Sequence, residues 1–462
     1  MPLVMGVDSS TQSTKVELRD ADTGELVGQG RAAHPPTTPP RSEQHPDAWW
    51  HAFEAARAGL PTPDVIAVAG QQHGMVVTDE QGAPLRAAKL WNDTESAPDA
   101  EWLRKQLGDE DWARACGSVP VAAFTIAKLS WLHRSEPDTW TRVRRVCLPH
   151  DWLTFRLSGE LVTDRGDASG TGYFSAAENE YRFDLLAIID RDFEWEPRLP
   201  RVCDPYERIG NVAPGTGDNM AAALGLALAP GDVAVSIGTS GTVFAVSDTP
   251  TFDASGAVAG FADATGRFLP LVCTLNATKV TDAVARLLGI DHAELDTLAL
   301  ASPPGAEGVT VVPYFDGERT PNRPDARGTI AGLRSDVTRE QLARAAFEGV
   351  ICGLLDGWDA LSATGVATNG RLFVVGGGAH SRAFVQVLAD LAGRPVYVPK
   401  DTEQVVAGAC VQAAAALHGR PADEIGVEWK MGAVGAGVEP TGDVDRDAIR
   451  ARYHAAAGVA SK

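Results

Sequence analysis

Basic residues are scarce in this sequence. Its 462 residues include 41 Lys and Arg against 61 Asp and Glu, which gives a formal net charge of −20. Binding to nucleic acid and attachment to anionic membranes both need clustered Lys and Arg to neutralise phosphate groups. The acidic balance therefore argues against nucleic-acid and membrane partners. Backbone N–H groups, a metal ion or one placed Lys can still neutralise a small phosphate-bearing ligand.

Paired cysteines and long apolar segments are also missing. None of the six cysteines forms a Cys-x-x-Cys pair or has a His at metal-ligand spacing, so buried thiols in a reducing compartment are favoured over disulfides or a zinc site. The longest apolar stretches, near 220–229 and 413–417, are too short to span a bilayer. The chain enters strand-like sequence at once, which predicts no signal peptide. Together these absences predict a cytoplasmic protein.

The length of the chain predicts two domains. A single hydrophobic core seldom grows beyond about 250–300 residues, and this chain has 462. Hydrophobic residues make up 44% of it and charged residues 22%, close to the average of globular proteins. The Pro-Gly-Asp at 230–232 is the predicted junction, so the expected domains are 1–229 and 230–462.

One local pattern occurs twice, about half the chain apart. In residues 4–19 a buried strand, a hydroxyl-rich turn at 9–14 and a second strand follow one another. Residues 233–246 have the same order, with a small-residue turn at 238–242. A repeat of this kind suggests a duplicated domain with the site between the two halves.

Helical patterns separate the predicted strands. Asp47 is the expected N-cap of a helix over 49–60. Residues 339–361 carry apolar side chains at three-and-four spacing, with Glu340, Arg344 and Glu348 on the predicted polar side. Because strands alternate with helices, the sequence predicts an α/β fold with mixed sheets.

The two turns are candidate phosphate-binding sites. Successive backbone N–H groups in a turn of small residues form a nest for anionic oxygens, and small side chains let phosphate approach closely. One such turn is usually no more than a turn, but two at equivalent positions favour phosphate binding. The segment 376–379 (Gly-Gly-Gly-Ala) follows a predicted strand and either leaves room for a flat ligand or a phosphate, or forms a tight strand–helix turn.

Polar residues at strand ends are the other candidates. Asp8 ends the first strand and points into the first turn. Asp218 precedes an Ala-rich helix and is either its N-cap or, given the flanking glycines, a catalytic group. The segment 70–74 (Gly-Gln-Gln-His-Gly) offers directional hydrogen-bond groups, which suit either a polyhydroxylated ligand or a loop whose polar groups are satisfied internally. The segment 91–93 (Trp-Asn-Asp) presents the same alternatives.

Several further segments occur in the order found in one enzyme family. They are Phe-Thr-Ile-Ala-Lys-Leu-Ser-Trp-Leu at 124–132, Gly-Glu-Arg-Thr-Pro at 317–321, Gly-Thr-Ile-Ala-Gly-Leu at 328–333 and Gln-Leu-Ala-Arg-Ala-Ala-Phe-Glu at 341–348. With the turns described above, they make the chain, from residue 5 to about 417, resemble the FGGY carbohydrate kinases.

The resemblance implies a fold and a separate function for each of two domains. The expected fold is α/β, with two duplicated domains of the actin/hexokinase/Hsp70 (ribonuclease H-like) type. Mixed sheets are flanked by helices, and the active site is expected in the interdomain cleft. Residues 1–229 would then be the sugar-binding kinase domain and 230–462 the nucleotide-binding kinase domain. Relatives are commonly dimers, so a homodimer is expected by analogy.

The resemblance also implies roles for residues of this chain. It makes Asp218 the general base and assigns Mg²⁺ to Asp8 and Asp218. The expected sugar-binding residues are Gln72, His73, Trp91, Asp218 and Asn219. The expected ATP-binding residues are Thr11, Gln12, Ser13, Lys15, Gly238, Thr239, Ser240, Gly377, Gly378 and Ala379. Among these, Thr11 and Thr239 would contact phosphate through hydroxyl and N–H groups.

The sequence departs from the family's pattern in three places. Gln72 stands where the family usually has Met, and Ser10 where the first loop usually has Gly. The segment 209–217 is short and is expected to lack a strand that relatives carry before the catalytic Asp.

The implied reaction is the Mg²⁺-dependent transfer of the γ-phosphoryl group of ATP to O5 of D-xylulose, which gives D-xylulose 5-phosphate. One alternative keeps this chemistry on another small ketose or polyol, such as ribulose, L-xylulose or glycerol. A remote alternative is a non-enzymatic ATP-binding module of the same superfamily, which would have no need of a sugar-binding motif.

Overall fold

In the computed structural model, residues 1–401, 403–442 and 444–458 are described. The chain forms two compact units. Unit 1 consists of Met1–Leu228, Val246–Leu269 and Glu403–Gly432. Unit 2 takes the described residues of Ala229–Ala245, Pro270–Thr402 and Ala433–Lys462. The first segment of unit 1 therefore ends beside the junction expected at 229/230, and two later segments return to that unit. The assignment of sugar to one domain and nucleotide to the other stays a prediction.

A five-stranded mixed sheet organises unit 1. Its strands follow the order β13-β5-β1-β2-β3, and β1 pairs antiparallel with β2 and parallel with β5. Their bounds are β1 (Leu3–Ser9), β2 (Ser13–Asp20), β3 (Leu26–Ala33), β5 (Val65–Gly70) and β13 (Thr216–Gly217). The edge strand β13 has two residues, preceded by one isolated bridge from Val212 to Ile66. The short segment 209–217, which was expected to lack a strand, thus contains the two-residue strand β13, which pairs with β5 and ends next to Asp218.

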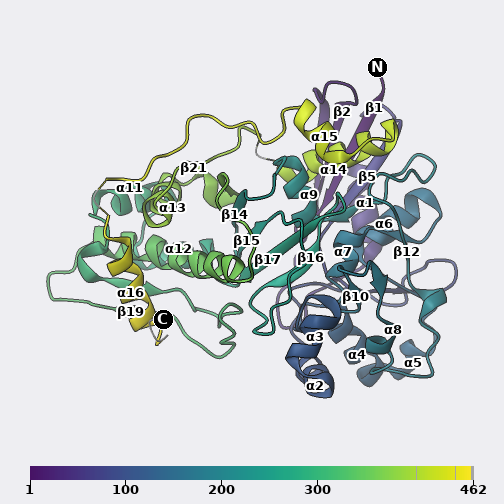
Figure 1. The fold of residues 1–462 in the computed structure, drawn as a ribbon, viewed down its shortest axis with the longest axis horizontal. Helices are drawn as coiled ribbons and strands as arrows, with labels where there is room; N and C mark the ends of the chain where they lie inside the picture. Colours follow the sequence, from purple (N-terminus) through teal and green to yellow (C-terminus); the bar gives the residue numbers. More distant parts are fainter. Residues whose placement is uncertain (402, 443, 459–462) are drawn as a thin grey trace. The chain divides into compact units, whose positions relative to one another are not determined.

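Helices pack on both faces of this sheet (Figure 1). Met5 and Val7 lie in one core cluster with Trp49 and Phe53 of α1 (Pro46–Ala56). Since side chains alternate along a strand, Gly6 faces the opposite side. There its N–H donates to Sγ of Cys410, 3.0 Å away in α14 (Gln404–His418).

The start of α1 differs from the sequence prediction. The helix begins at Pro46, and its N-cap is His45, whose side chain accepts a hydrogen bond from the N–H of Asp47. Proline is favoured in the first helical turn because its fixed φ suits the helix and its missing N–H needs no partner. Asp47 therefore lies inside the first turn, and the prediction that it caps the helix is wrong.

The remaining elements of unit 1 surround the sheet. They are β4 (Glu43–Gln44), β6 (Val76–Thr78), β7 (Ala88–Lys89), α2 (Ala97–Leu107), α3 (Asp109–Cys116), α4 (Thr125–Ser135), α5 (Pro137–Trp140), β8 (Arg145–Cys147), α6 (Pro149–Ser158), β9 (Val162–Thr163), α7 (Arg165–Ser169), β10 (Phe174–Ser175), β11 (Glu180–Tyr181), α8 (Phe183–Leu186), a 3₁₀ helix (Glu196–Arg198), β12 (Arg201–Val202), α9 (Asp218–Gly225), β16 (Ala259–Ala262) and α15 (Ala422–Glu428).

Unit 2 repeats the arrangement of the first sheet. Its strands follow the order β17-β15-β14-β20-β21, with β14 antiparallel to β15 and parallel to β20. Their bounds are β14 (Val233–Ile237), β15 (Gly241–Ala245), β17 (Phe268–Thr274), β20 (Leu372–Val375) and β21 (Val396–Tyr397). Each unit thus has a central strand that runs through a tight turn into its antiparallel neighbour. The predicted duplication and α/β class are confirmed.

Helices also cover the sheet of unit 2. The other elements of this unit are α10 (Thr278–Leu288), α11 (His292–Ala301), a 3₁₀ helix (Ala306–Gly308), β18 (Thr310–Val312), β19 (Thr329–Ala331), α12 (Arg339–Ala363), a 3₁₀ helix (Gly377–His380), α13 (Arg382–Ala392) and α16 (Arg446–Ala456). Among the helices of the described ranges, none combines the length and the apolar character that a membrane crossing requires.

Helix α12 corrects a second expectation. Arg344 and Glu348, predicted on its polar side, are 3% and 4% exposed. The Arg344 guanidinium lies 2.7 Å from Glu348 in the same helix and 3.0 Å from Asp390 of α13. Because Asp390 comes from a distant segment, a helical pattern read from α12 alone could not place this charged pair inside the protein.

The close crossing of α14 and α9 requires glycine at position 408, because there is no room for a side chain there. A Cβ atom on Gly408 would overlap the carbonyl oxygen of Ala221. We expect Gly408→Ala to destabilise the protein by about 1–3 kcal/mol, despite the better helix propensity of Ala, because overpacking moves the two helices apart. Gly426→Ala is the control, since its Cβ would come no closer than 3.6 Å to a neighbouring atom. A lower Tm for Gly408→Ala with an unchanged or higher Tm for Gly426→Ala checks the prediction.

Candidate active site

The turn between β1 and β2 is closed by its own hydroxyl groups. The N–H and Oγ of Ser10 both donate to the carbonyl of Ser13, at 3.1 and 2.9 Å. The hydroxyl of Thr11 donates to Oε1 of Gln71 (3.1 Å) and accepts from Nε1 of Trp91 (2.9 Å). The structure therefore brings Trp91 to the first turn. The Thr11 hydroxyl, which the resemblance assigns to phosphate, is thus hydrogen-bonded to Gln71 and Trp91.

Asp8 lies at the end of β1, just before this turn. It is 5% exposed, and its Oδ1 has no hydrogen-bond partner among the residues that the structure describes. Nζ of Lys15 lies 3.9 Å from Oδ2 of Asp8 and 2.5 Å from Oε2 of Glu403. Burial raises the pKa of Asp8 to about 6, although the charge of Lys15 opposes the shift. A buried carboxylate with an oxygen left over is suited to a cation.

Asp218 is the first residue of α9, and the N-cap of that helix is Gly217. Its Oδ1 accepts hydrogen bonds from the backbone N–H and from Nδ2 of Asn219, at 2.8 and 2.9 Å. Burial, with Asp8 and Asp167 nearby, raises the pKa of Asp218 to about 7. Of the two alternatives for this residue, capping is excluded. The carboxylate instead lies within electrostatic reach of Asp8.

Gln72 and His73 follow β5, the strand that pairs with β13. Oε1 of Gln72 accepts a hydrogen bond from Nδ2 of Asn219 at 2.8 Å. His73 has φ +65°, a left-handed conformation that is costly for a residue with a side chain. Its Nδ1 lies 2.7 Å from the carbonyl of Gly170. Since a carbonyl only accepts, Nδ1 donates this hydrogen bond.

A buried charged cluster, which sequence reasoning missed, lies behind these residues. His150 is fully buried, with Nδ1 2.7 Å from Asp167 and Nε2 3.1 Å from Asp151. Burial alone would lower the pKa of His150, but Asp151, Asp167 and Asp164 together raise it to about 9. The available signal was a His-Asp pair followed by two more Asp residues within eighteen positions.

The glycine-rich segments of unit 2 lie beside each other. In the turn after β14, the carbonyls of Gly238 and Thr239 accept from the N–H groups of Thr278 and Ala277 at the start of α10. Gly378 packs against the side chain of Ile237, the last residue of β14. Gly377 is exposed, and a Cβ on it would meet no atom within 4 Å. The two segments thus leave an exposed backbone edge next to the predicted phosphate turn.

The predicted site residues are divided between the two units. Unit 1 contains Asp8, Thr11, Gln12, Ser13, Lys15, Gln72, His73, Trp91, Asp218 and Asn219. Unit 2 contains Gly238, Thr239, Ser240, Gly377, Gly378 and Ala379. Their roles in binding and catalysis stay predictions.

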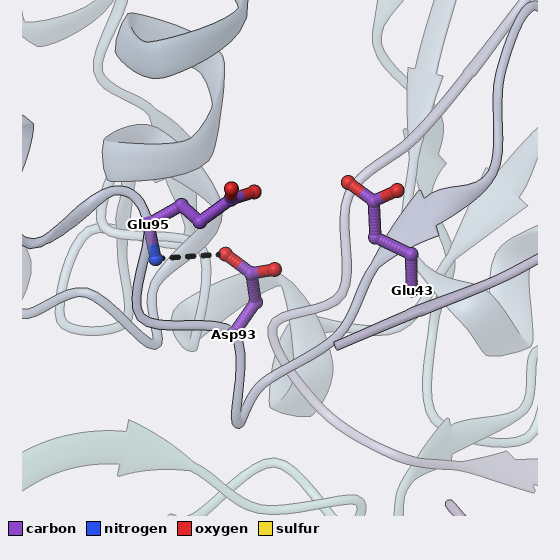
Figure 2. A group of neighbouring side chains, drawn as sticks. All are labelled: Glu43, Asp93 and Glu95. Carbon is purple, nitrogen blue, oxygen red and sulfur yellow. Dashed lines mark hydrogen bonds between the residues drawn. The ribbon is translucent and has the colours of Figure 1, made fainter. Parts of the chain in front are cut away.

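Three carboxylates gather elsewhere in unit 1, at Glu43, Asp93 and Glu95 (Figure 2). Each offers an oxygen within 4.8 Å of the others, as a metal site would require. Nζ of Lys89, however, lies 3.2 Å from Glu43, 3.1 Å from Asp93 and 2.5 Å from Glu95. It also stacks over the ring of Trp131, 3.9 Å from the centroid. An ammonium group therefore already occupies the position that a cation would take.

Comparison with known proteins identifies the family. The model of the FGGY family of carbohydrate kinases, N-terminal domain, matches residues 3–246, and that of the C-terminal domain matches residues 233–417. The chain is 44% identical to a protein named xylulose kinase from Streptomyces coelicolor, over 94% of this chain and 92% of that protein. It is equally similar to a xylulose kinase from Streptomyces rubiginosus, with the same coverage.

A solved structure supports the same conclusion. The crystal structure of xylulose kinase from Bifidobacterium adolescentis is 41% identical in sequence, covers 99% of both chains and superposes with a TM-score of 0.87. Its two-domain α/β architecture is the one described here. The chain belongs to the FGGY family of carbohydrate kinases.

Proposed function

We propose that this chain phosphorylates D-xylulose with ATP to give D-xylulose 5-phosphate. As a member of a carbohydrate kinase family, it uses ATP and a sugar. The xylulose kinases to which it is 44% identical favour xylulose as that sugar. The observation that supports the proposal most is the meeting of Asp218, Asn219 and Gln72, because a base stands there beside amide groups that can orient hydroxyls.

In the proposed reaction, the carboxylate of Asp218 accepts the proton of the attacking sugar hydroxyl. Its two hydrogen bonds from Asn219 fix the rotation of the carboxylate, so that Oδ2 remains available to face the hydroxyl. Phosphoryl transfer needs mainly positioning and neutralisation of charge. His73 is the proposed partner of a second sugar hydroxyl, and its strained backbone conformation is consistent with a role in binding.

The carboxylates of Asp8 and Asp218 fit a divalent cation. Oδ1 of Asp8 is buried without a hydrogen-bond partner within the described part of the chain. Burial and the negative charge of Asp8 raise the pKa of Asp218, because a nearby like charge disfavours the ionised form. Mg²⁺ commonly takes one or two protein carboxylates and completes its octahedron with water and phosphate oxygens, so these two residues suffice. When bound, it would neutralise charge on the ATP phosphates.

The nucleotide is proposed to use the exposed glycines of unit 2. We expect Gly377→Val to raise the KM for ATP at least about tenfold, because a branched side chain would occupy the free space over the backbone. The Tm should stay unchanged, since a Cβ there meets no neighbour within 4 Å. Gly435→Val is the control, because Gly435 is equally open and also lies in unit 2. An unchanged KM for ATP would remove Gly377 from the nucleotide site.

The test of the proposed function is ATP turnover with D-xylulose, L-ribulose, L-xylulose and glycerol, each with and without Mg²⁺. Metal-dependent turnover that strongly prefers D-xylulose is the expected result. A preference for another acceptor would keep the kinase and replace the substrate. ATP binding without turnover of any acceptor would contradict the proposed reaction.

A further inference from the structure

Two carboxamides form a bridge between the proposed base and the buried cluster. Gln72 is only 4% exposed and packs over Gly217, where an added Cβ would lie 2.8 Å from its Cγ and 3.0 Å from its Nε2. Its amide meets Asn219 on one side. On the other side lies Asp167, which is 0% exposed. Burial raises the pKa of Asp167, whereas the hydrogen bond to His150 and the nearby side chain of Gln72 oppose the shift.

The orientation of each amide follows from the chemistry of its neighbours. An ionised carboxylate only accepts hydrogen bonds, so the atom of Asn219 that faces Asp218 must be the NH₂ group. That same NH₂ group lies 2.8 Å from Gln72, which must therefore present its carbonyl oxygen. The NH₂ group of Gln72 is then left to face Asp167. The NH₂ group of each amide therefore faces an acceptor, and the two ends of the bridge are the carboxylates of Asp167 and Asp218.

The outer end of the bridge has unused hydrogen-bonding capacity. Oδ2 of Asp167 is 2.7 Å from Nδ1 of His150, whereas Oδ1 is buried and has no hydrogen-bond partner in the described ranges. Nε2 of Gln72 is likewise buried without a partner there. A buried donor and a buried acceptor without partners are each costly, and a hydrogen bond between them would satisfy both.

We propose that Asp167 is a positioning residue that acts through Gln72 to hold the carboxamide of Asn219 in one orientation. Both hydrogens of the Asn219 NH₂ group are used by Gln72 and Asp218, so its carbonyl oxygen is the group presented to the substrate. That oxygen accepts a hydrogen bond from a sugar hydroxyl next to the one that reacts. The inference rests on the proposed function of Asp218 and Asn219 and assigns a role to Asp167.

The proposal makes a directional prediction for Asp167→Asn. The substituted side chain keeps one oxygen for His150 and turns its NH₂ group toward the NH₂ group of Gln72. Gln72 and then Asn219 must turn over, which points the Asn219 oxygen at the Asp218 carboxylate. One mispaired buried polar group costs enough to lower kcat/KM for the sugar about 10–100-fold. The loss should appear mainly in the KM for the sugar, with the KM for ATP unchanged.

A reciprocal exchange tests the mechanism of this effect. In the double variant Asp167→Asn, Gln72→Glu, the acceptor moves to position 72, where it can receive the NH₂ group of the substituted side chain and that of Asn219. The double variant should regain at least about tenfold of the lost kcat/KM, whereas Gln72→Glu alone sets two carboxylates against each other and should be impaired. A double variant no better than Asp167→Asn alone would overturn the proposal.

A third variant covers the case in which Asp167→Asn does not fold. Gln72→Met keeps the His150–Asp167 pair and removes the bridge, so it should raise the KM for the sugar about tenfold with little change in Tm. A sugar KM within about twofold of the wild type would contradict the proposal. All variants are assayed with the acceptor that the wild-type enzyme prefers. If that acceptor is not D-xylulose, the proposed substrate is wrong, but the comparison of the variants with the wild type still tests the role of Asp167.

Discussion

Asp218→Asn should lower kcat by about 10²–10⁴-fold, because an amide cannot accept the proton of the sugar hydroxyl. The variant retains the size of the side chain and the oxygen that accepts from Asn219. It also removes a carboxylate whose pKa is raised by burial and by Asp8 and Asp167, so the fold should be at least as stable. Steady-state kinetics with Tm measurements check both parts.

The control is the same change at Asp111, which also lies in the first turn of a helix but is exposed. Asp111→Asn should leave kcat unchanged. A positioned base contributes about 10²–10⁴-fold to the rate. If Asp218→Asn retains a kcat within about tenfold of the wild type, Asp218 is therefore not the general base. A large loss of kcat together with a large fall in Tm would point to a structural role instead.

Lys89→Met should lower the free energy of unfolding by about 3–5 kcal/mol, the cost of removing one partner from a buried ion pair. Lys89 is 0% exposed and contacts Glu43, Asp93 and Glu95, so its loss leaves three neighbouring carboxylates without their central cation. Its side chain also lowers the pKa of Glu95. Denaturant unfolding of the two proteins measures the difference.

The geometry of the three carboxylates adds a second expected result. Their oxygens lie within 4.8 Å of one another, so the variant should bind Ca²⁺ in the space left by the ammonium group. Ca²⁺ should then raise the Tm of Lys89→Met and leave that of the wild type unchanged. Lys105→Met, on the exposed surface of α2, is the control for the loss of a positive charge. An unchanged stability of Lys89→Met would show that the buried contacts contribute nothing.

The parts of the fold that depend on residues close together in the sequence could be predicted. The hairpins β1–β2 and β14–β15 are visible because apolar residues and small turn residues alternate over short stretches. Their duplication follows by comparing one with the other. Charged residues inside the protein were not predictable, since the burial of Arg344 depends on Asp390, and that of Lys89 on Glu43.

The candidate site shows the same distinction. The end of each strand indicated Asp8, Gln72 and His73 as candidates, and the glycines around Asp218 favoured a role beyond capping. Their mutual arrangement is a product of the tertiary fold, because Asn219 reaches Gln72 across 147 positions of the chain. Asp167 was missed for this reason, as its significance lies in its neighbours and not in its own sequence context.

The return of α14 to unit 1 bears on how the protein is made. The face of β1 that carries Gly6 is covered by Cys410, 404 positions later in the chain. On the ribosome, this face must remain uncovered until nearly the whole polypeptide has emerged, although β1 is among the first residues synthesised. Domains usually fold in the order of synthesis, but here one face of the first sheet can be covered by α14 only after most of unit 2 has left the exit tunnel. Translation speed and chaperone binding during that interval should therefore influence the yield of native enzyme more than in a kinase whose first domain is continuous in sequence.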